Sequence, residues 1–344
     1  MIKVCVIGHF GYGKELVNGQ TIKTKNVTNE LESQFSESQV MKIDTHGGIK
    51  RLPEIIGKMI YAFIQCKNII ILPAHNGIKL FVPLCTLMNS IFHRELHYVV
   101  IGGWLNTFLN GHRKLERKLK KFTGIYVETM GMKNTLQHRG FRNVEVMPNF
   151  KDIQVLRKDE LVYTTTEPLK VCTFSRVIKE KGIEEAIAAV TTINTKYGRV
   201  IFSLDIYGQI ENEQMEWFEK IEHEFPMFVK YKGMVPFDQS VEVLKNYYAL
   251  LFPTYYEGEG FAGTLIDAMA AGVPAIVSNW KYNKEIVVQG KTGILIKARN
   301  QDSLNEALEH SLDISWNTMK TTCIEEAMRY VPDKAIKILL MNLE

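Results

Sequence analysis

The sequence lacks the cysteine patterns that build disulfide frameworks and zinc sites. Its five cysteines (Cys5, Cys66, Cys85, Cys172 and Cys323) lie far apart, and none belongs to a CxxC pair. An odd number of thiols cannot close completely into internal bridges, so reduced cysteines and a cytoplasmic location are expected. No cluster of histidine, cysteine and aspartate has the spacing of metal ligands, and we expect no metal site.

Long apolar runs are also absent. The first residues carry one lysine and only a short apolar run before Gly8, which is too short for the core of a signal peptide. The most apolar stretch, 69–92, is interrupted by Pro73, His75 and Pro83, so it predicts a buried strand followed by a buried helix. We therefore expect no export signal and no membrane-spanning helix.

The two halves of the chain differ in charge. Residues 1–150 hold 20 of the 42 lysines and arginines and 10 of the 38 acids, which leaves 22 and 28 for residues 151–344. Only the first half is therefore expected to meet an anionic partner. Much of its excess lies in one stretch, which contains Arg113, Lys114, Arg117, Lys118, Lys120 and Lys121.

Two series of apolar segments of strand length, separated by longer amphipathic segments, indicate two domains. The length of 344 residues agrees with this number. The first series predicts strands at 3–7, 39–43, 68–72, 97–101, 124–127 and 144–147. The second series begins after Pro168 and predicts strands at 170–174, 200–207, 228–231, 249–252, 275–278 and 293–296.

Strands that alternate with helices of crossover length favour parallel sheets covered by helices. The predicted fold class is α/β, with two Rossmann-like doubly wound domains. We place the first domain at 1–152 and the second at 168–330, with a polar linker at 153–167. A C-terminal helix is predicted at 331–344.

The segment PTYYEGEGFAGTLIDAMAAGVP at 253–274 is the most specific indication of chemistry. It follows a predicted strand and opens a predicted helix. Gly258, Gly260 and Gly263 permit tight turns and a close approach of the backbone to a ligand. The free N–H groups of residues 261–265 then lie at a helix N-terminus, which favours an anion. The segment therefore predicts a phosphate site.

Two carboxylates, Glu259 and Asp267, frame this phosphate site. Because bare acids repel phosphate, we expect them to accept hydrogen bonds from neutral hydroxyls, one set on a sugar and one on a ribose. In the structural alternative, Asp267 complements the helix dipole and Glu259 is a solvated loop acid. The coincidence of a glycine-rich turn, a helix start and flanking acids favours the binding interpretation.

This segment resembles the signature of the retaining glycosyltransferases of family 4, whose GT-B fold has two domains facing each other across a cleft. The signature has two glutamates separated by seven residues, before an Ala-x-Ala-Gly-x-Pro helix end, and here Asp267 replaces the second glutamate. The similarity extends over TFSRVIKEKGI at 173–183 and KTGIL at 291–295, so it covers nearly all of the second half. In the first half the resemblance is diffuse.

By this resemblance Arg176 and Lys181 grip the donor diphosphate and, with Glu259, form the catalytic set. Basic residues near a helix start oppose the helix dipole, which favours a functional role over the alternative of a solvated pair. In the first half the resemblance puts Gly19 close to the phosphates. The donor-binding residues implied in this way are Gly19, Arg176, Lys181, Met234, Glu259, Gly260, Phe261, Ala262, Gly263, Thr264, Leu265 and Asp267.

The resemblance implies transfer of a sugar from a nucleotide diphosphate, of uridine type, with retention of configuration. The acceptor is a hydroxyl of a saccharide or a lipid-linked glycan, in the biosynthesis of a polysaccharide such as a capsule or exopolysaccharide. No cofactor and no metal are expected, since the helix end and two cations neutralise the diphosphate. Two alternatives stay open: a sugar-nucleotide 2-epimerase of the same fold, and a non-catalytic partner subunit of a glycosyltransferase.

The first half also carries a near match to the phosphate loop GxxxxGK[ST], at residues 8–15. Its last position is Glu15, whose carboxylate repels phosphate where a magnesium-binding hydroxyl is needed. A nucleotidase is therefore disfavoured. The dinucleotide fingerprint GxGxxG is absent, which disfavours a dehydrogenase.

A general base is harder to assign. Family 4 enzymes often have a histidine after the strand that corresponds to 97–101, but this chain has GGW at 102–104. His9 and His75 are candidate cleft residues, and the alternative for each is a hydrogen-bonded structural group. In the front-face path implied by the resemblance, the departing phosphate oxygen takes the acceptor's proton, and Glu259 positions the sugar.

The basic stretch at 110–122 has Leu115, Leu119 and Phe122 at helical spacing, with cations around them. It predicts a basic amphipathic helix that either docks on the sheet or attaches to an anionic membrane surface. In the second case the protein is peripheral on the inner face of the cell membrane. Nucleic acid is not expected, since no aromatic residues alternate with the basic ones.

Overall fold

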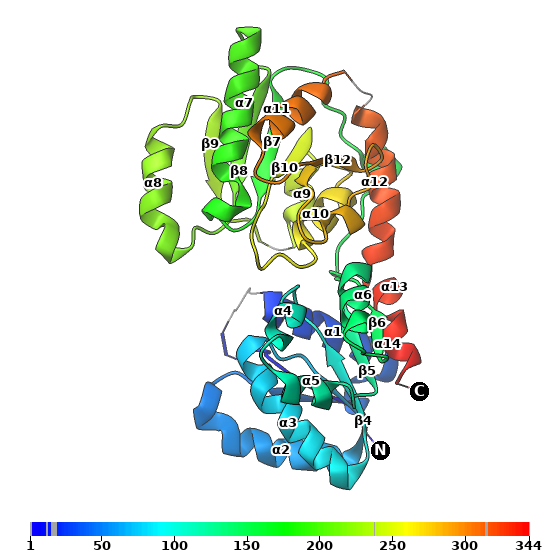
Figure 1. The fold of residues 1–344 in the computed structure, drawn as a ribbon. Helices are drawn as coiled ribbons and strands as arrows, with labels where there is room; N and C mark the ends of the chain where they lie inside the picture. Colours follow the sequence, from blue (N-terminus) through cyan, green and yellow to red (C-terminus); the bar gives the residue numbers. More distant parts are fainter. Residues whose placement is uncertain (1, 12, 15–18, 237, 314–315, 344) are drawn as a thin grey trace. The chain divides into compact units, whose positions relative to one another are not determined.

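The computed structural model describes residues 2–11, 13–14, 19–236, 238–313 and 316–343, which form two compact units (Figure 1). The first unit is Met1–Asp152 together with Val331–Glu344, and the second is Ile153–Tyr330. Each unit contains one six-stranded sheet in which all neighbouring strands are parallel. The predicted α/β class with two doubly wound units is confirmed.

The sheet of the first unit has the strand order β2-β1-β3-β4-β5-β6. Its strands are β1 (Ile2–Gly8), β2 (Val40–Asp44), β3 (Cys66–Ile71), β4 (Glu95–Val99), β5 (Gly124–Val127) and β6 (Val144–Val146). All six predicted strands are confirmed. Parallel strands that are covered on both faces consist of nearly continuous apolar runs. The sequence has such a run at each of these places, and the buried run of β1 is an example.

Helices cover both faces of this sheet. They are α1 (Gly19–Phe35), α2 (Leu52–Gln65), α3 (His75–Phe92), α4 (Leu105–Leu109), α5 (Arg113–Leu119), α6 (Met130–His138), α13 (Pro332–Ala335) and α14 (Lys337–Met341). Helices α1, α13 and α14 share one apolar core with the sheet. Right-handed crossovers carry α2, α3 and α5 over the opposite face, where α2 packs on α3 and α3 on α5.

The C-terminal segment differs from its prediction. A single helix over 331–344 is wrong, because the segment forms α13 and α14, which are separate short helices on either side of Ile336. Their buried residues Ile336, Leu339 and Leu343 belong to the core of the first unit. The side-chain amide of Asn68 also donates to the carbonyl oxygen of Leu343, at 3.1 Å. The end of the chain therefore completes the first unit.

The sheet of the second unit has the strand order β12-β11-β10-β7-β8-β9. Its strands are β7 (Leu169–Phe174), β8 (Phe202–Tyr207), β9 (Val229–Gly233), β10 (Ala249–Phe252), β11 (Ala275–Ser278) and β12 (Gly293–Ile296). Each lies where the sequence predicts it. The helices are α7 (Ile183–Tyr197), α8 (Met215–His223), α9 (Ser240–Leu244), α10 (Gly263–Ala270), α11 (Gln301–His310) and α12 (Met319–Ala327).

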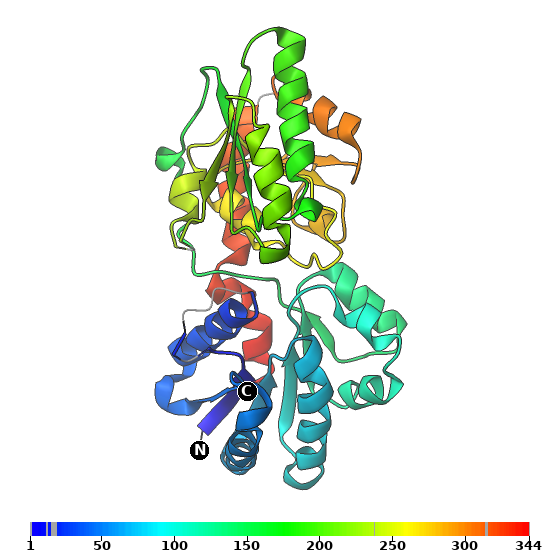
Figure 2. The same ribbon diagram turned by 90° about the vertical axis from the view of Figure 1, so that its left-hand side faces the viewer.

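Alternate residues of these strands fill two separate apolar cores. Val171 and Leu251 pack with α7, α8 and α11, whereas Cys172 and Leu250 pack with α9, α10 and α12. Helices lie on both faces of this sheet (Figure 2). This division follows from the two-residue period of a strand. Among the helices of the described segments, none has the combined length and apolarity that a bilayer crossing requires.

The segment 153–167, predicted as a linker, groups with the second unit. Leu156 and Leu161 are buried in the core formed with α10 and α12. The backbone N–H of Leu156 also donates to the carbonyl oxygen of Ala270, at 3.0 Å. These contacts tie the segment to the helix that the sequence predicts to hold phosphate.

Candidate functional site

The predicted chemical residues of the second unit meet at one edge of its sheet. Strands β7, β8 and β9 follow one another outward, and the chain then returns to form β10 on the other side of β7. In open α/β sheets, ligands bind outside the carboxyl ends of the strands where the strand order reverses. Arg176 and Lys181 follow β7, and Glu259 and helix α10 follow β10. The two motifs therefore share the ligand-binding position of the fold.

An ion pair joins the two motifs. Lys181 Nζ lies 2.6 Å from Glu259 Oε2, and the side chains are only 7% and 8% exposed. The hydroxyl of Thr254 donates to the same carboxylate oxygen at 2.9 Å, and Thr254 is completely buried. Because breaking a buried ion pair leaves an uncompensated charge, this contact fixes both groups at the sheet edge. The alternative of a solvated Glu259 is wrong.

Tyr256 brings the second cation to the same place. Arg176 Cζ and Lys181 Nζ each lie 5.2 Å from the centre of its ring. The backbone carbonyl of Tyr256 accepts from the indole N–H of Trp280, at 2.8 Å. Arg176 remains half-exposed and pairs with Glu211 at 3.0 Å. Two cations thus lie beside one aromatic ring, and both are of a kind that can bind phosphate.

Two glycines allow the loops at this edge to approach closely. Gly208 has φ +138°, and a Cβ there would lie 1.7 Å from the carbonyl oxygen of Ser175. Gly182 has φ +77°, and a Cβ there would lie 2.7 Å from the carbonyl oxygen of Pro253. Only glycine fits both the backbone angles and the space. The loops after β7, β8 and β10 are therefore held together by backbone contact.

Helix α10 begins beside these loops, at Gly263. Its N-cap residue is Ala262, and no side chain caps the helix. The hydroxyl oxygen of Thr264 is buried and has no hydrogen-bond partner in the described part of the chain. The amide of Leu265 donates to the carbonyl oxygen of Ala262, at 3.1 Å. A helix start with no side-chain cap is suited to an anion.

The remaining predicted donor residues differ in their surroundings. Asp267 lies within α10 and is 3% exposed, so its predicted contact with a ribose stays a prediction. Met234 follows β9 and is 67% exposed. Gly19 begins α1 in the first unit, and Gly260 and Phe261 precede α10. Binding of a donor by these residues remains an expectation.

The first unit has its own polar cluster at the ends of β1 and β2. His9 Nδ1 lies 2.8 Å from the hydroxyl of Thr21, and His9 Nε2 lies 3.0 Å from His46 Nδ1. Burial, followed by the nearby His46, lowers the pKa of His9. The carboxylate of Asp44 accepts from the backbone N–H of His46, at 2.9 Å. His9 is thus a hydrogen-bonded group, as in the structural alternative.

Two other features predicted from the sequence also lie in the first unit: His75 and the near match to a phosphate loop. The ring of His75 stacks on that of Trp104 at 4.0 Å, and Trp104 donates to the carbonyl oxygen of Ile101 at 2.7 Å. In the near match to a phosphate loop, Lys14 is exposed and Glu15 lies outside the described residues. Within those residues no group of three or more histidines, cysteines or acids is placed to hold a metal ion.

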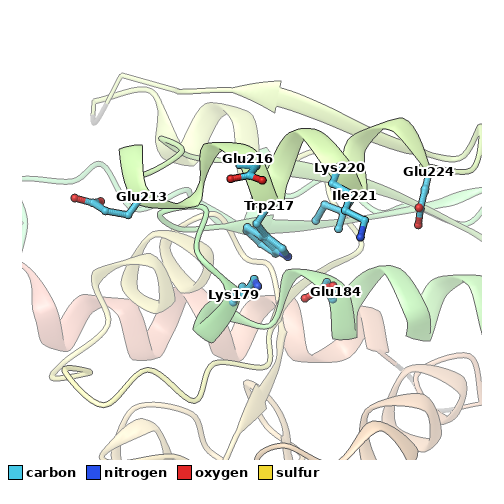
Figure 3. A pocket seen from close by; sticks show the side chains of 8 residues that line it. All are labelled: Lys179, Glu184, Glu213, Glu216, Trp217, Lys220, Ile221 and Glu224. Atoms are coloured by element: carbon cyan, nitrogen blue, oxygen red, sulfur yellow. The ribbon is translucent and has the colours of Figure 1, made fainter.

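A pocket of about 690 Å³ lies between α8 and the start of α7 (Figure 3), and neither Lys181 nor Glu259 lines it. Trp217 points from α8 into it, towards Lys179 and Glu184. Lys179 Nζ lies 5.7 Å from the centre of the Trp217 ring. The residues that line the pocket are Lys179, Glu184, Glu213, Glu216, Trp217, Lys220, Ile221 and Glu224. None of them belongs to the predicted donor set.

Helix α5 contains the basic stretch, and its apolar side is buried. Leu115, Leu119 and Phe122 are 6%, 0% and 3% exposed. These residues pack inside the first unit, so the apolar side of α5 is docked, as in the first alternative. Attachment of its cations to an anionic membrane surface stays a prediction.

Sequence reasoning missed Thr254, Tyr256, Glu211 and Trp280. They act through contacts between loops that are distant in the sequence, and no spacing rule identifies such contacts. The available signal was the position of Thr254 and Tyr256 between the end of a strand and the glycine-rich turn.

Comparisons with known proteins agree with this arrangement. The family described as glycosyl transferases group 1 matches residues 158–329. Glycogen synthase of Mycobacterium tuberculosis is 27% identical over 150 residues, which are 43% of this chain and 35% of that protein. The GtfA subunit of a UDP-N-acetylglucosamine–peptide N-acetylglucosaminyltransferase from Streptococcus gordonii is 28% identical over 174 residues, 49% of this chain and 33% of that protein. The chain thus spans about a third of these curated relatives.

A solved structure extends the likeness to the whole fold. Anabaena Alr3699/HepE in complex with UDP and glucose has a TM-score of 0.74 and 13% identity, over 100% of this chain and 99% of its own. The predicted GT-B fold class is therefore confirmed for both units. Since the family match covers half of the sequence, the chain belongs to the group 1 glycosyl transferases.

Proposed function

We propose that the protein is a retaining glycosyltransferase of family 4, which transfers a sugar from a uridine diphosphate sugar to a hydroxyl of a saccharide or lipid-linked glycan. One observation carries the proposal: the buried Lys181–Glu259 pair lies at the reversal of strand order, beside the start of α10. A cation, a carboxylate and the amides of a helix start are groups that suit a sugar diphosphate.

The positive groups and the carboxylate of the proposed site have different roles. Arg176, Lys181 and the amides before Thr264 stabilise the negative charge that develops on the leaving diphosphate. Glu259 accepts hydrogen bonds from sugar hydroxyls, and Thr254 holds its carboxylate in place. Donor binding replaces part of the Lys181–Glu259 contact, because the ammonium group then also faces a phosphate oxygen.

The reaction follows a front-face path. The bond between the anomeric carbon and the phosphate oxygen breaks, and the acceptor oxygen bonds to the same face of that carbon. The acceptor's proton passes to the departing phosphate oxygen. This path uses no protein base. The cations and helix amides supply the positive charge that a metal supplies elsewhere.

Other observations support the location and the acceptor class. All five cysteines are buried and free, which favours a reducing cytoplasm. Polysaccharide biosynthesis is supported by the match to a capsular polysaccharide biosynthesis glycosyltransferase of Staphylococcus aureus, 26% identical over 138 residues. The shape of the pocket in the first unit determines which sugar and which acceptor are used.

A nuclear magnetic resonance assay tests the function. The purified protein is incubated with uridine diphosphate sugars and saccharide acceptors, with a chelator present, and the anomeric configuration of the product is recorded. We expect a product that retains the donor configuration and a rate unaffected by the chelator. An inverted product contradicts the mechanism. Formation of an epimeric donor without acceptor selects the 2-epimerase, and no turnover of any donor favours the partner subunit.

A further inference from the structure

The pocket between α8 and the start of α7 contains charged groups that the protein itself does not neutralise. Four carboxylates and two ammonium groups line it (Figure 3). In the part of the chain that the structure describes, none of these six groups forms an ion pair. They belong to Glu184, Glu213, Glu216, Glu224, Lys179 and Lys220. The pocket therefore offers both donors and acceptors of hydrogen bonds to a ligand.

Trp217 adds an apolar face to the pocket. Its ring points from α8 into the pocket (Figure 3), and Ile221 lies one turn further along the same side of the helix. Trp217 Nε1 is buried and has no hydrogen-bond partner within the described residues. Because buried donors are normally paired, an oxygen atom of a bound molecule would supply the acceptor that this N–H group lacks.

This mixture of groups indicates the class of the ligand. Carboxylates accept hydrogen bonds, whereas ammonium groups and an indole N–H donate them. A sugar hydroxyl does both, and the C–H face of a sugar ring can pack on an aromatic ring. A phosphorylated ligand fits less well, since four carboxylates outnumber two ammonium groups. A sugar chain without charge therefore suits this pocket best.

A short helix, Lys179–Lys181, connects the pocket with the proposed donor site. Lys181 Nζ lies 2.6 Å from Glu259 in the donor site, and Lys179 Nζ lies 5.7 Å from the centre of the Trp217 ring. Two neighbouring lysines of one helical turn thus contribute to two different places. A ligand in the pocket would be bound beside the segment that carries a donor-site cation.

We propose that this pocket is a second saccharide-binding site, which binds sugar residues of the acceptor or product chain that do not react. The assignment rests on the proposed function, because a transferase that extends a saccharide has such a chain as its substrate. When one chain binds at two places, the second contact forms at a high effective concentration. The pocket would then keep a growing saccharide bound between successive transfers.

Nuclear magnetic resonance of the full chain, with a heavy nitrogen isotope in its tryptophans, tests the proposal. The four tryptophans give four indole signals, and the signal that is lost in Trp217→Phe belongs to Trp217. The probes are a linear tetrasaccharide of glucose and a linear tetrasaccharide of N-acetylglucosamine. We expect at least one probe to move the Trp217 signal saturably. The Trp280 signal reports on the donor site, because its N–H donates to the carbonyl oxygen of Tyr256 at 2.8 Å, and uridine diphosphate should move it.

A double variant tests the carboxylates of the pocket. Glu213→Gln with Glu216→Gln keeps the shape of both side chains and removes two negative charges. We expect the affinity for the tetrasaccharide to fall by about tenfold. The matched control, Glu219→Gln with Glu222→Gln, changes two exposed acids of α8 that do not line the pocket and should leave the affinity unchanged.

Failure of this proposal can be distinguished from failure of the proposed function. If neither tetrasaccharide moves the Trp217 signal while uridine diphosphate moves that of Trp280, the second site is overturned and the donor site stands. A Trp217 signal that moves with spermidine alone also overturns it and assigns the pocket to a cationic ligand. Equal affinities of the double variant and its control overturn the role of the carboxylates. Movement of the Trp217 signal with a tetrasaccharide, without movement of the Trp280 signal, supports the second site and contradicts the donor site.

Discussion

The two units share one architecture, a six-stranded parallel sheet covered by helices, but they differ in strand order and in the contacts of their charged residues. In the second unit, charged residues from two loops meet as a buried pair at the edge of the sheet, Lys181 with Glu259. In the first unit, the ends of β1 and β2 carry histidines that bond to each other and to Thr21. Its own buried pair, Lys23 with Glu128, is longer, at 3.7 Å. The difference teaches that fold pattern alone does not make a site; the close approach of loops does.

The largest expected difference between the units is catalytic. Lys181→Ala removes a cation from the leaving diphosphate, and we expect turnover at saturating donor to fall by about 10²–10³. Lys14→Ala, in the near match to a phosphate loop, should change turnover little. Steady-state rates of both variants check this comparison. Equal losses of turnover in the two variants would assign the diphosphate to both units and would contradict the expected difference between the units.

The second difference is in the energy of burying charge. Glu259→Gln leaves the ammonium group of Lys181 buried and unpaired, and we expect the free energy of unfolding to fall by about 3 kcal/mol. Glu54→Gln removes an exposed partner of Arg51 and should change it by less than about 0.5 kcal/mol. Urea denaturation measures both. A similar small change in the two variants would mean that the Lys181–Glu259 pair is not buried in solution.

The first unit should show the stronger dependence of stability on pH below neutrality. Burial lowers the pKa of His97 to about 4 from 6.5. Protonation therefore favours the unfolded chain, and stability that is fully present above pH 6.5 is lost as the pH falls towards 4. Between pH 7 and 5 we expect a loss of about 2 kcal/mol from this group.

The measurement for that prediction is the slope of the free energy of unfolding against pH. Urea titrations at several pH values should give a flatter pH dependence for His97→Gln than for the parent. The exposed His223→Gln, in the second unit, serves as the control and should follow the parent. Parallel curves for His97→Gln and the parent would show that His97 does not titrate differently on unfolding.

The smallest expected effect sharpens the role of Thr254. Thr254→Val removes the hydroxyl that bonds to Glu259, and we expect kcat/KM to fall by about tenfold through kcat. Thr254→Ser keeps the hydroxyl and should restore most of the rate. A rise in KM alone, with no rescue by serine, would indicate that Thr254 serves packing only.

Much of the architecture was predictable from the sequence. All twelve strands were correct because parallel strands buried on both faces require apolar runs of strand length. The five-residue helix α4 was not predicted, because it is too short to show a helical period of apolar residues. The C-terminal segment was predicted as one helix, but it forms α13 and α14, which both pack in one core of the first unit.

The candidate site was predictable in part. Fixed spacing within one loop identified Glu259, and position after a strand identified Lys181. The contact of these residues with each other, and the roles of Thr254 and Tyr256, depend on loops brought together by the sheet. The basic helix α5 shows a further limit: amphipathicity predicts an apolar face but does not say what covers it.

Diffraction from crystals of the protein soaked with uridine diphosphate tests the central claim most directly. The account predicts density for the diphosphate between the ammonium group of Lys181, the guanidinium of Arg176 and the amides before Thr264. Density for the diphosphate only at residues 8–14 of the first unit, or an empty site with Lys181 still bound to Glu259 alone, would contradict it.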